Sequence, residues 1–245
     1  MIVTPVKTSK ILASKISITE LLDTNITQLS EDQILVITSK IIALCENRVV
    51  SIENTDRKEL IQTEADLYLP ANFSKYNYHF TIKRNTLAAA AGIDESNSDN
   101  KYVLWPCDPQ KSANEIRAYL QNKFQLKQIG VIITDSVSQP MRLGTTGVAI
   151  GYSGLSPTND YRGKQDLFGK EMTVTRSNVV GGLASAAVLA MGEGTEQTPL
   201  CVINSVPFVN FCKKDPSKKE LSEYFIDLET DLFAPMISSL PWQKK

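Results

Sequence analysis

Hydrophobic positions along the 245-residue chain form short apolar runs and alternating stretches, and both patterns predict strands. The continuous apolar runs predict buried strands at residues 34–38, 130–134 and 199–203. The alternating stretches predict strands with one exposed face at residues 79–83 and 172–175. Because these strands are interleaved irregularly with helical patterns, we expect an α+β fold with mixed sheets.

Apolar residues at helical spacing predict helices over residues 57–68, 112–124, 177–191 and 217–232. Ser112 with Glu115, and Ser217 with Glu220, have the spacing of a capping box and should begin two of these helices. Gly192 is expected to end the third helix. A long loop with glycines at 144, 147, 151 and 154 is expected after the strand at 130–134.

Composition excludes several classes of partner and compartment. The 26 Lys and Arg residues nearly balance the 27 Asp and Glu residues and form no cluster, so we expect neither nucleic acid nor a membrane as partner. The four cysteines are widely separated, as in proteins with reduced core thiols. No apolar run reaches about 18 residues and no signal-peptide pattern opens the chain, so a cytoplasmic protein is expected.

Two isolated aspartates are the strongest candidates for chemistry. Asp135 follows the apolar run at 130–134, and Asp94 lies between small residues and a polar loop. Carboxylates in such places can bind Mg²⁺ or Mn²⁺ together with waters and substrate phosphates. Isolated aspartates also cap helices and hold turns, so both readings stay open. The single histidine, His79, lies between aromatic residues and is expected to pack, which leaves no Ser/His/Asp triad.

Two glycine-rich segments could meet an anionic substrate. Arg142 lies within the expected glycine loop, where its guanidinium could grip a phosphate or carboxylate, or simply be solvated. Residues 191–195 place two glycines around Glu193, so backbone N–H groups could meet phosphates there. An ordinary helix C-cap is the alternative for this second segment.

Many of these segments, in order, resemble the coenzyme F-420 γ-glutamyl ligase family over about residues 1–205. The resemblance is densest at residues 130–135, 142–151, 160–163, 166–171 and 191–194, and it includes 38–41 and 92–94. It implies a two-domain subunit in an intertwined homodimer. Residues 1–75 and 206–245 would form one domain, and residues 76–205 would form the metal- and nucleotide-binding domain.

The resemblance implies an amide ligase that uses GTP or ATP with Mg²⁺ or Mn²⁺. A small cofactor's carboxylate would take the γ-phosphoryl group, and the amine of L-glutamate would then displace phosphate from the acyl phosphate. Implied metal ligands are Asp94, Asp135 and Ser136, and Arg142 is expected to orient a phosphate or carboxylate. Implied nucleotide contacts are Ser39, Asn97, Leu189, Met191, Gly192, Glu193, Gly194 and Thr195.

Some positions depart from the family pattern. Leu44 stands where the family usually has a lysine that contacts the nucleotide, and Gly181 and Gly182 replace an acidic pair. These changes suggest a different acceptor or nucleotide mode. The deazaflavin coenzyme F-420 precursor is the leading acceptor. Folate and a catalytically silent binding homologue are the alternatives.

Overall fold

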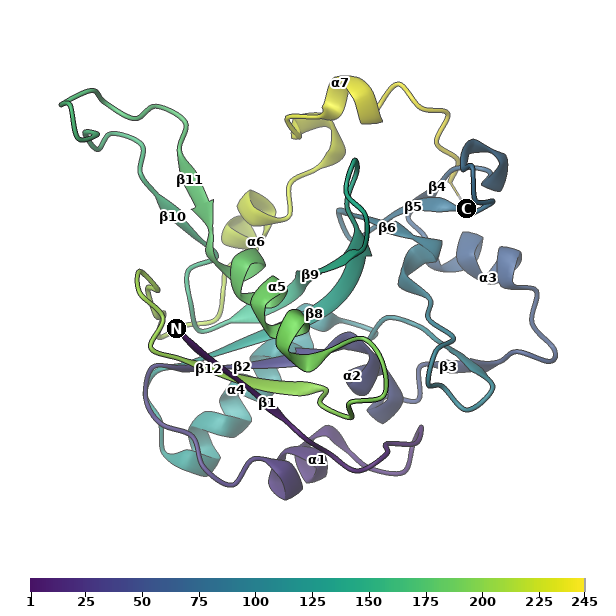
Figure 1. Ribbon diagram of the computed structural model, residues 1–245, viewed down its shortest axis with the longest axis horizontal. Coiled ribbons are helices and arrows are strands. Elements are labelled where there is room, and N and C mark those ends of the chain that lie inside the picture. Colours follow the sequence, from purple (N-terminus) through teal and green to yellow (C-terminus); the bar gives the residue numbers. More distant parts are fainter. Residues whose placement is uncertain (245) are drawn as a thin grey trace.

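The computed structural model describes residues 1–244, and its centre is a five-stranded mixed sheet (Figure 1). The strand order is β1 (Ile2–Val6), β12 (Leu200–Asn204), β2 (Gln33–Thr38), β8 (Ile129–Ser138) and β9 (Thr145–Ser153). β2 and β8 run parallel, whereas the other neighbours are antiparallel. The expected α+β fold with mixed sheets is therefore confirmed.

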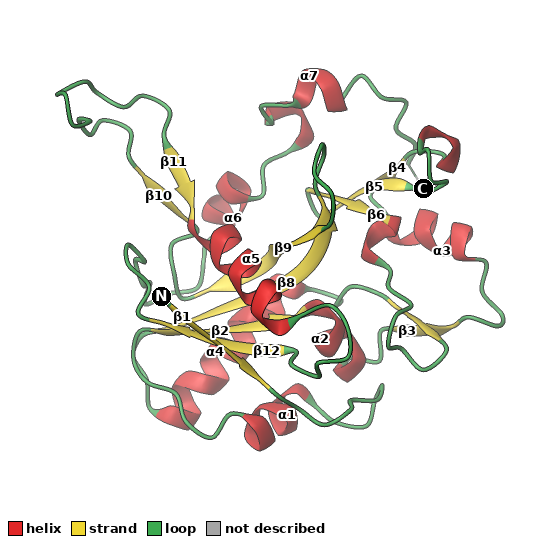
Figure 2. Cartoon of the chain, viewed as in Figure 1, coloured by secondary structure: helices red, strands yellow, loops and turns green. Residues whose placement is uncertain are grey.

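Helices cover both faces of this sheet (Figure 2). Leu35 and Ile37 of β2 belong to one core, and their neighbours Ile34 and Val36 belong to the other, because side chains alternate along a strand. The apolar run at 34–38 is continuous for this reason, since both faces of the strand are buried. The first core packs against α1 (Ile18–Asn25), α2 (Ser39–Cys45) and α4 (Pro109–Phe124), and the second packs against α5 (Val179–Met191).

A smaller lobe has its own apolar core, which includes Ile61, Ala91 and Tyr102. It joins two small sheets, one helix and two 3-10 turns. The sheets are β3 (Val49–Ser51) with β7 (Lys101–Val103), and β4 (Leu67–Tyr68) with β5 (Phe80–Lys83) and β6 (Thr86–Ala89). The helical parts are α3 (Arg57–Glu64), η1 (Ala71–Phe73) and η2 (Ala90–Gly92).

Two hairpins extend outward from the central sheet (Figure 1). One is the far end of β8 and β9, and the other is β10 (Thr158–Asp160) with β11 (Arg176–Asn178) and the loop between them. The C-terminal segment contains α6 (Lys218–Tyr224), η3 (Leu228–Thr230) and α7 (Ala234–Ile237). This segment returns to the smaller lobe, where Tyr68 and Gln243 exchange backbone hydrogen bonds of 3.0 and 2.9 Å.

The glycine loop expected after residue 134 is instead a β-hairpin. β8 continues to Ser138, so Asp135 and Ser136 lie within the strand, and β9 pairs with it from Thr145 onward. Beyond the core, the two strands satisfy each other's backbone hydrogen bonds and need no apolar run. Gly147 allows close packing, since an added Cβ would lie 2.5 Å from the carbonyl oxygen of Ala184.

Other predicted boundaries differ locally. α4 begins at Pro109 and is capped by Asp108, which accepts from the backbone N–H of Lys111 (3.0 Å), so the capping box predicted at Ser112 is wrong. The predicted strand at 172–175 is absent among the described residues, and pairing begins at Arg176. The helix predicted over 57–68 ends at Glu64, because Leu67 and Tyr68 join a sheet.

Several terminal signals are confirmed. Ser217 and Glu220 form a capping box at α6, although this helix ends at Tyr224 and does not reach 232. α5 ends at Gly192, whose φ of +78° favours glycine. All four cysteines are free, but Cys107 is exposed and is not a core residue. Within residues 1–244, every helix is too short or too polar to span a bilayer.

The predicted division into residues 1–75 plus 206–245 and residues 76–205 stays a prediction. Strands from both parts share the central sheet, since β1 and β2 pair with β12 and β8. Residue 245 of that division lies outside the described residues.

Candidate functional site

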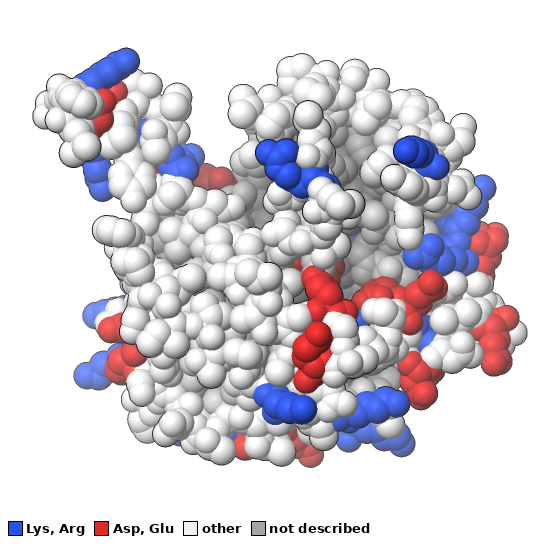
Figure 3. Space-filling view, in the orientation of Figure 1, with Lys and Arg blue, Asp and Glu red and all other residues white. Residues whose placement is uncertain are grey.

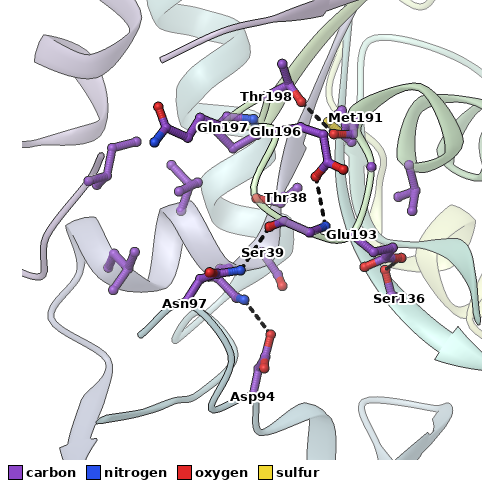
Figure 4. Close-up of a pocket in the computed structure, with 18 of the residues that line it drawn as sticks. Thr38, Ser39, Asp94, Asn97, Ser136, Met191, Glu193, Glu196, Gln197 and Thr198 are labelled. Carbon is purple, nitrogen blue, oxygen red and sulfur yellow. Dashed lines mark hydrogen bonds and ion pairs between the residues drawn. The ribbon is translucent and has the colours of Figure 1, made fainter. Parts of the chain in front are cut away.

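A cavity of about 510 Å³ opens at the carboxyl ends of the parallel strands β2 and β8 (Figure 4). Open sheets commonly bind ligands there, because the chain leaves the sheet and side chains converge. β2 passes directly into α2, so Thr38 and Ser39 line the cavity from one strand, and Asp135 and Ser136 line it from the other. Residues 8–11 and the loops at 92–99 and 192–199 form its other walls.

Asp135 is held in a partly buried position by neutral donors. A register shift between Ile133 and Thr134 directly precedes it, and such bulges re-aim the following side chains. Its carboxylate accepts from the Ser39 hydroxyl (3.1 Å) and from the Trp105 indole N–H. Burial raises the pKa of Asp135 despite these donors, and the negative charge of Asp94 raises it further. Both carboxylates line the same cavity, where a cation between them would relieve the repulsion of like charges.

Asp94 is fixed by its backbone and neutralised by an ammonium. Its backbone N–H and carbonyl pair with Val103 at 3.0 and 2.7 Å, which anchors the loop to β7. The Lys40 ammonium lies 2.5 Å from its carboxylate, and the Ser96 N–H donates to it at 2.7 Å. Burial alone would raise the pKa of Asp94, but Lys40 and Ser96 outweigh it and lower that pKa below the usual value. α2 therefore serves both aspartates, through Ser39 and Lys40.

The loop after α5 closes the opposite wall (Figure 4). The Ser136 hydroxyl donates to Glu193 at 2.6 Å, which ties this loop to β8. The Asn97 amide donates to the Gly194 carbonyl oxygen (3.0 Å), which ties it to the Asp94 loop. The backbone N–H of Gly194 donates to the Glu196 carboxylate at 2.8 Å. The Glu196 carboxylate thus occupies an N–H that could equally donate to a phosphate oxygen.

The cavity carries an excess of negative charge. Five carboxylates line it and only two ammoniums, Lys10 and Lys40. Figure 3 shows acidic side chains gathered in the middle of this face, beside the C-terminal end of α5. A triphosphate would be repelled here unless cations entered with it. The five carboxylates are those of Asp94, Asp99, Asp135, Glu193 and Glu196.

The donor set suits a hard cation that brings its own further ligands. Within residues 1–244, no three His, Cys, Asp or Glu side chains form a ready-made metal cluster. Two carboxylates with neighbouring hydroxyls are instead what Mg²⁺ commonly uses, the remaining positions being taken by waters and substrate phosphates. Asp94, Asp135 and the hydroxyl of Ser136 offer such oxygens in the same cavity.

Comparison with known proteins identifies the family. Residues 6–205 match the family model described as F420-0:Gamma-glutamyl ligase. The chain belongs to this ligase family. The resemblance noted in the sequence is therefore confirmed.

Relatives in the F420-0:Gamma-glutamyl ligase family carry the name Coenzyme F420:L-glutamate ligase. The one from Methanosarcina mazei is 34% identical over 207 residues, which is 78% of this chain and 80% of the relative. The one from Methanothermobacter thermautotrophicus is 33% identical over 196 residues, 74% of this chain and 77% of the relative. The one from Methanococcus maripaludis strain S2 is 39% identical over 145 residues, so the match spans only 58% of each protein.

Most site residues suggested by the family resemblance line the cavity. They are Ser39, Asp94, Asn97, Asp135, Ser136, Met191, Gly192, Glu193, Gly194 and Thr195. Leu189 does not, since its side chain is 87% exposed on α5. Arg142 also lies outside the lining, at the exposed tip between β8 and β9, where its guanidinium donates to the Met141 carbonyl oxygen (2.8 Å).

Sequence reasoning missed two residues that set the properties of the aspartates. Lys40 pairs with Asp94, and its position directly after Ser39 at a strand–helix junction was an available signal. Trp105 donates to Asp135 from a distant, apolar segment, so no local pattern marks it. Leu44, which the family resemblance sets in the place of a lysine, lines the cavity but is only 5% exposed.

Proposed function

We propose that the protein is a nucleotide-dependent γ-glutamyl ligase that joins L-glutamate to a carboxylate of the deazaflavin coenzyme F-420 precursor. The observation that carries the proposal is the convergence of Asp94 and Asp135, 41 positions apart in the chain, in one acidic cavity. Family membership and the names of the relatives support this acceptor over folate.

The reaction proceeds through an acyl phosphate. The acceptor carboxylate attacks the γ-phosphorus of GTP or ATP, so an O–P bond forms as the bond to the nucleoside diphosphate breaks. The amine of L-glutamate then attacks the acyl carbon, phosphate leaves, and the amine loses a proton as the amide forms. Such a transfer depends on positioning and charge neutralisation more than on covalent work by side chains.

The aspartates would hold Mg²⁺ or Mn²⁺, with Ser136 supplying a neighbouring oxygen. When bound, the cation supplies positive charge for the phosphate oxygens. Lys40 now neutralises Asp94 at 2.5 Å. Its ammonium would be released to the phosphates once the positive charge at Asp94 is supplied by a metal.

The nucleotide would lie along the loop after α5. Asn97 already reaches across the cavity to Gly194, and the Gly194 N–H is occupied by Glu196. A phosphate oxygen would replace the Glu196 carboxylate at this N–H, because both are oxyanions. Ser39, which the family resemblance implies as a nucleotide contact, would instead position Asp135, because its hydroxyl donates to that carboxylate.

The intertwined homodimer forms part of this proposal. Four large apolar side chains on the two projecting hairpins, those of Met141, Leu143, Leu167 and Phe168, are 94–107% exposed. Large apolar side chains exposed at projecting tips of this kind are commonly covered by a second copy. Arg142 lies on one of these hairpins, so it would orient a phosphate or carboxylate from across the subunit interface.

A catalytically silent homologue is the second candidate, and Leu44 favours it, because leucine cannot donate to a phosphate. Turnover separates the two. The purified protein would be incubated with the F-420 precursor, L-glutamate, Mn²⁺ and either GTP or ATP, and the glutamylated product followed by mass spectrometry. The ligase account predicts product with at least one nucleotide. Nucleotide binding without product would support the silent homologue and overturn the ligase proposal.

A further inference from the structure

A second cavity, of about 610 Å³, lies in the smaller lobe and shares no lining residue with the first. α3 and the loop at 70–79 form its walls, and Gln243 of the C-terminal segment closes one side. Gln243 is held there by its backbone pairing with Tyr68. The volume is in the range of small-molecule sites.

This second cavity has the opposite charge from the first. Arg57 and Lys58 line it, and no Asp or Glu does so in the described part of the chain. Neither cation takes part in an ion pair within residues 1–244. The amides of Asn72 and Asn77 add neutral donors. The cavity is therefore lined by positive charge and hydrogen-bond donors, and no carboxylate of the described residues in its lining pairs with them.

Arg57 provides the clearest sign of a missing ligand. Its Nε is buried and has no hydrogen-bond partner among the described residues. Leaving a buried charged donor without a partner costs free energy, so such groups in folded proteins commonly have an unseen ion or water as partner. The N-cap of α3 does not supply one, because the Asp56 carboxylate accepts from the backbone N–H groups of Lys58 and Glu59 and makes no hydrogen bond with the Arg57 Nε.

His79 places a second polar group on the same wall. The residue is only 6% exposed and lines the cavity. Its Nδ1 lies 3.1 Å from the Leu69 carbonyl oxygen, which can only accept, so Nδ1 carries the proton. Nε2 is then the acceptor of the ring and makes no hydrogen bond among the described residues, so the imidazole reports on a nearby oxyanion but does not hold it.

We propose that this cavity binds a small ligand through a carboxylate or phosphate group, held by Arg57 and Lys58 beside His79. An oxyanion accepts from the guanidinium of Arg57 and the ammonium of Lys58, and arginine binds such groups as a fork. This site is separate from the proposed ligase site, and the ligase proposal does not depend on it.

The single histidine of the chain makes the proposal directly testable. The imidazole resonances of His79 would be followed by NMR while inorganic phosphate or L-glutamate is added to the intact protein. We expect a saturable shift with at least one of the two, and the comparison decides between a phosphate and a carboxylate ligand. A shift that only rises linearly with both anions would overturn the proposal.

Variants locate the binding. Arg57→Gln removes the charge and leaves a shorter polar side chain, and it should weaken binding about tenfold or more, as loss of a charged hydrogen bond does. Lys58→Gln, at an exposed position, gives a second reading if the first variant folds poorly. Lys75→Gln is the control, since Lys75 is exposed on the same lobe but does not line the cavity. Equal weakening by all three variants would show general charge attraction and contradict the site.

Discussion

At the scale of single residues, the account depends on side chains that position Asp135. Trp105 donates to its carboxylate, and Gly92 leaves the space in which the indole lies. An added Cβ at Gly92 would lie 2.1 Å from the indole Nε1, and φ at this position is +69°. The Trp105 indole can therefore occupy this position only if residue 92 is glycine.

Gly92→Ala should displace the indole and weaken Mn²⁺ binding about tenfold, as loss of a group that orients a metal ligand does. The left-handed backbone should add about 1–2 kcal/mol of destabilisation. Gly163→Ala is the control, because its φ is +77° but no atom lies within 4 Å of an added Cβ. Calorimetric Mn²⁺ titration and urea unfolding would measure both effects. Equal loss of Mn²⁺ affinity in the two variants would show that the indole does not position the site.

The sequence identified the aspartates but not what surrounds them. Asp94 and Asp135 were visible as isolated carboxylates behind apolar segments. The Trp105 contact joins residues 30 positions apart, and the Gly92 contact depends on a close approach in space. Such contacts have no local pattern, so they could not be predicted.

At the scale of elements, a partly buried ion-pair network joins α3 to β5. The Glu64 carboxylate lies 2.7 Å from Lys83 and 2.8 Å from Arg48. Lys83 lies 5.6 Å from the centre of the Trp105 ring, so the network reaches the indole that holds Asp135. Burial would raise the pKa of Glu64, but the two cations outweigh it and lower that pKa.

Glu64→Gln should destabilise the fold by about 2–3 kcal/mol at neutral pH, because Lys83 stays buried without a charged partner. Since the folded-state pKa of Glu64 is lowered, its contribution is present above the unfolded-state pKa. It is lost as the pH falls through the folded-state value. The difference between wild type and variant, measured by urea unfolding, should therefore shrink in acid.

The exposed pair of Glu115 and Lys111, at 3.6 Å, gives the matched control for Glu64. Glu115→Gln should change stability by less than about 0.5 kcal/mol. If the two variants lost equal stability, or if the Glu64 effect did not vary with pH, the network would not have this role.

Local patterns predicted which elements form better than the residues at which these elements begin and end. The capping box at Ser217 and the stop at Gly192 act within one turn of a helix, and both were confirmed. The hairpin after residue 138 was mistaken for a loop, because its strands are stabilised by pairing with each other and need no apolar run. Pairing partners of this kind are set by the tertiary structure.

At the scale of the whole molecule, the two projecting hairpins predict self-association. Leu167 and Phe168 are 99% and 94% exposed at the end of the β10–β11 hairpin (Figure 1). The double variant Leu167→Ser, Phe168→Ser should convert a dimer to a monomer in light scattering, because burial of these side chains would be lost. Thr173→Ser on the same loop is the control and should leave the molar mass measured by light scattering at that of the dimer. A monomeric wild-type protein would contradict the homodimer.

Strand and helix patterns predicted the overall fold class, and most residues named by the family resemblance line the cavity, but the resemblance could not place Arg142. A single subunit leaves this side chain at a hairpin tip, outside the cavity lining. The hydrophobic pattern of one chain does not predict how two copies assemble, so the role of Arg142 remains a prediction that depends on the dimer.

The most direct test of the central claim is calorimetric titration of Mn²⁺ into wild type and Asp135→Asn, each with thermal unfolding. The amide oxygen can still accept from Trp105 and the amide N–H can donate to the Ser39 hydroxyl, but the substitution removes a carboxyl group whose pKa burial raises. A raised folded-state pKa means that this charge costs stability above the unfolded-state pKa, so the metal-free variant should unfold no lower than wild type. Mn²⁺ should bind wild type and raise its unfolding temperature, with neither effect in the variant. Equal Mn²⁺ binding by both proteins would contradict the account.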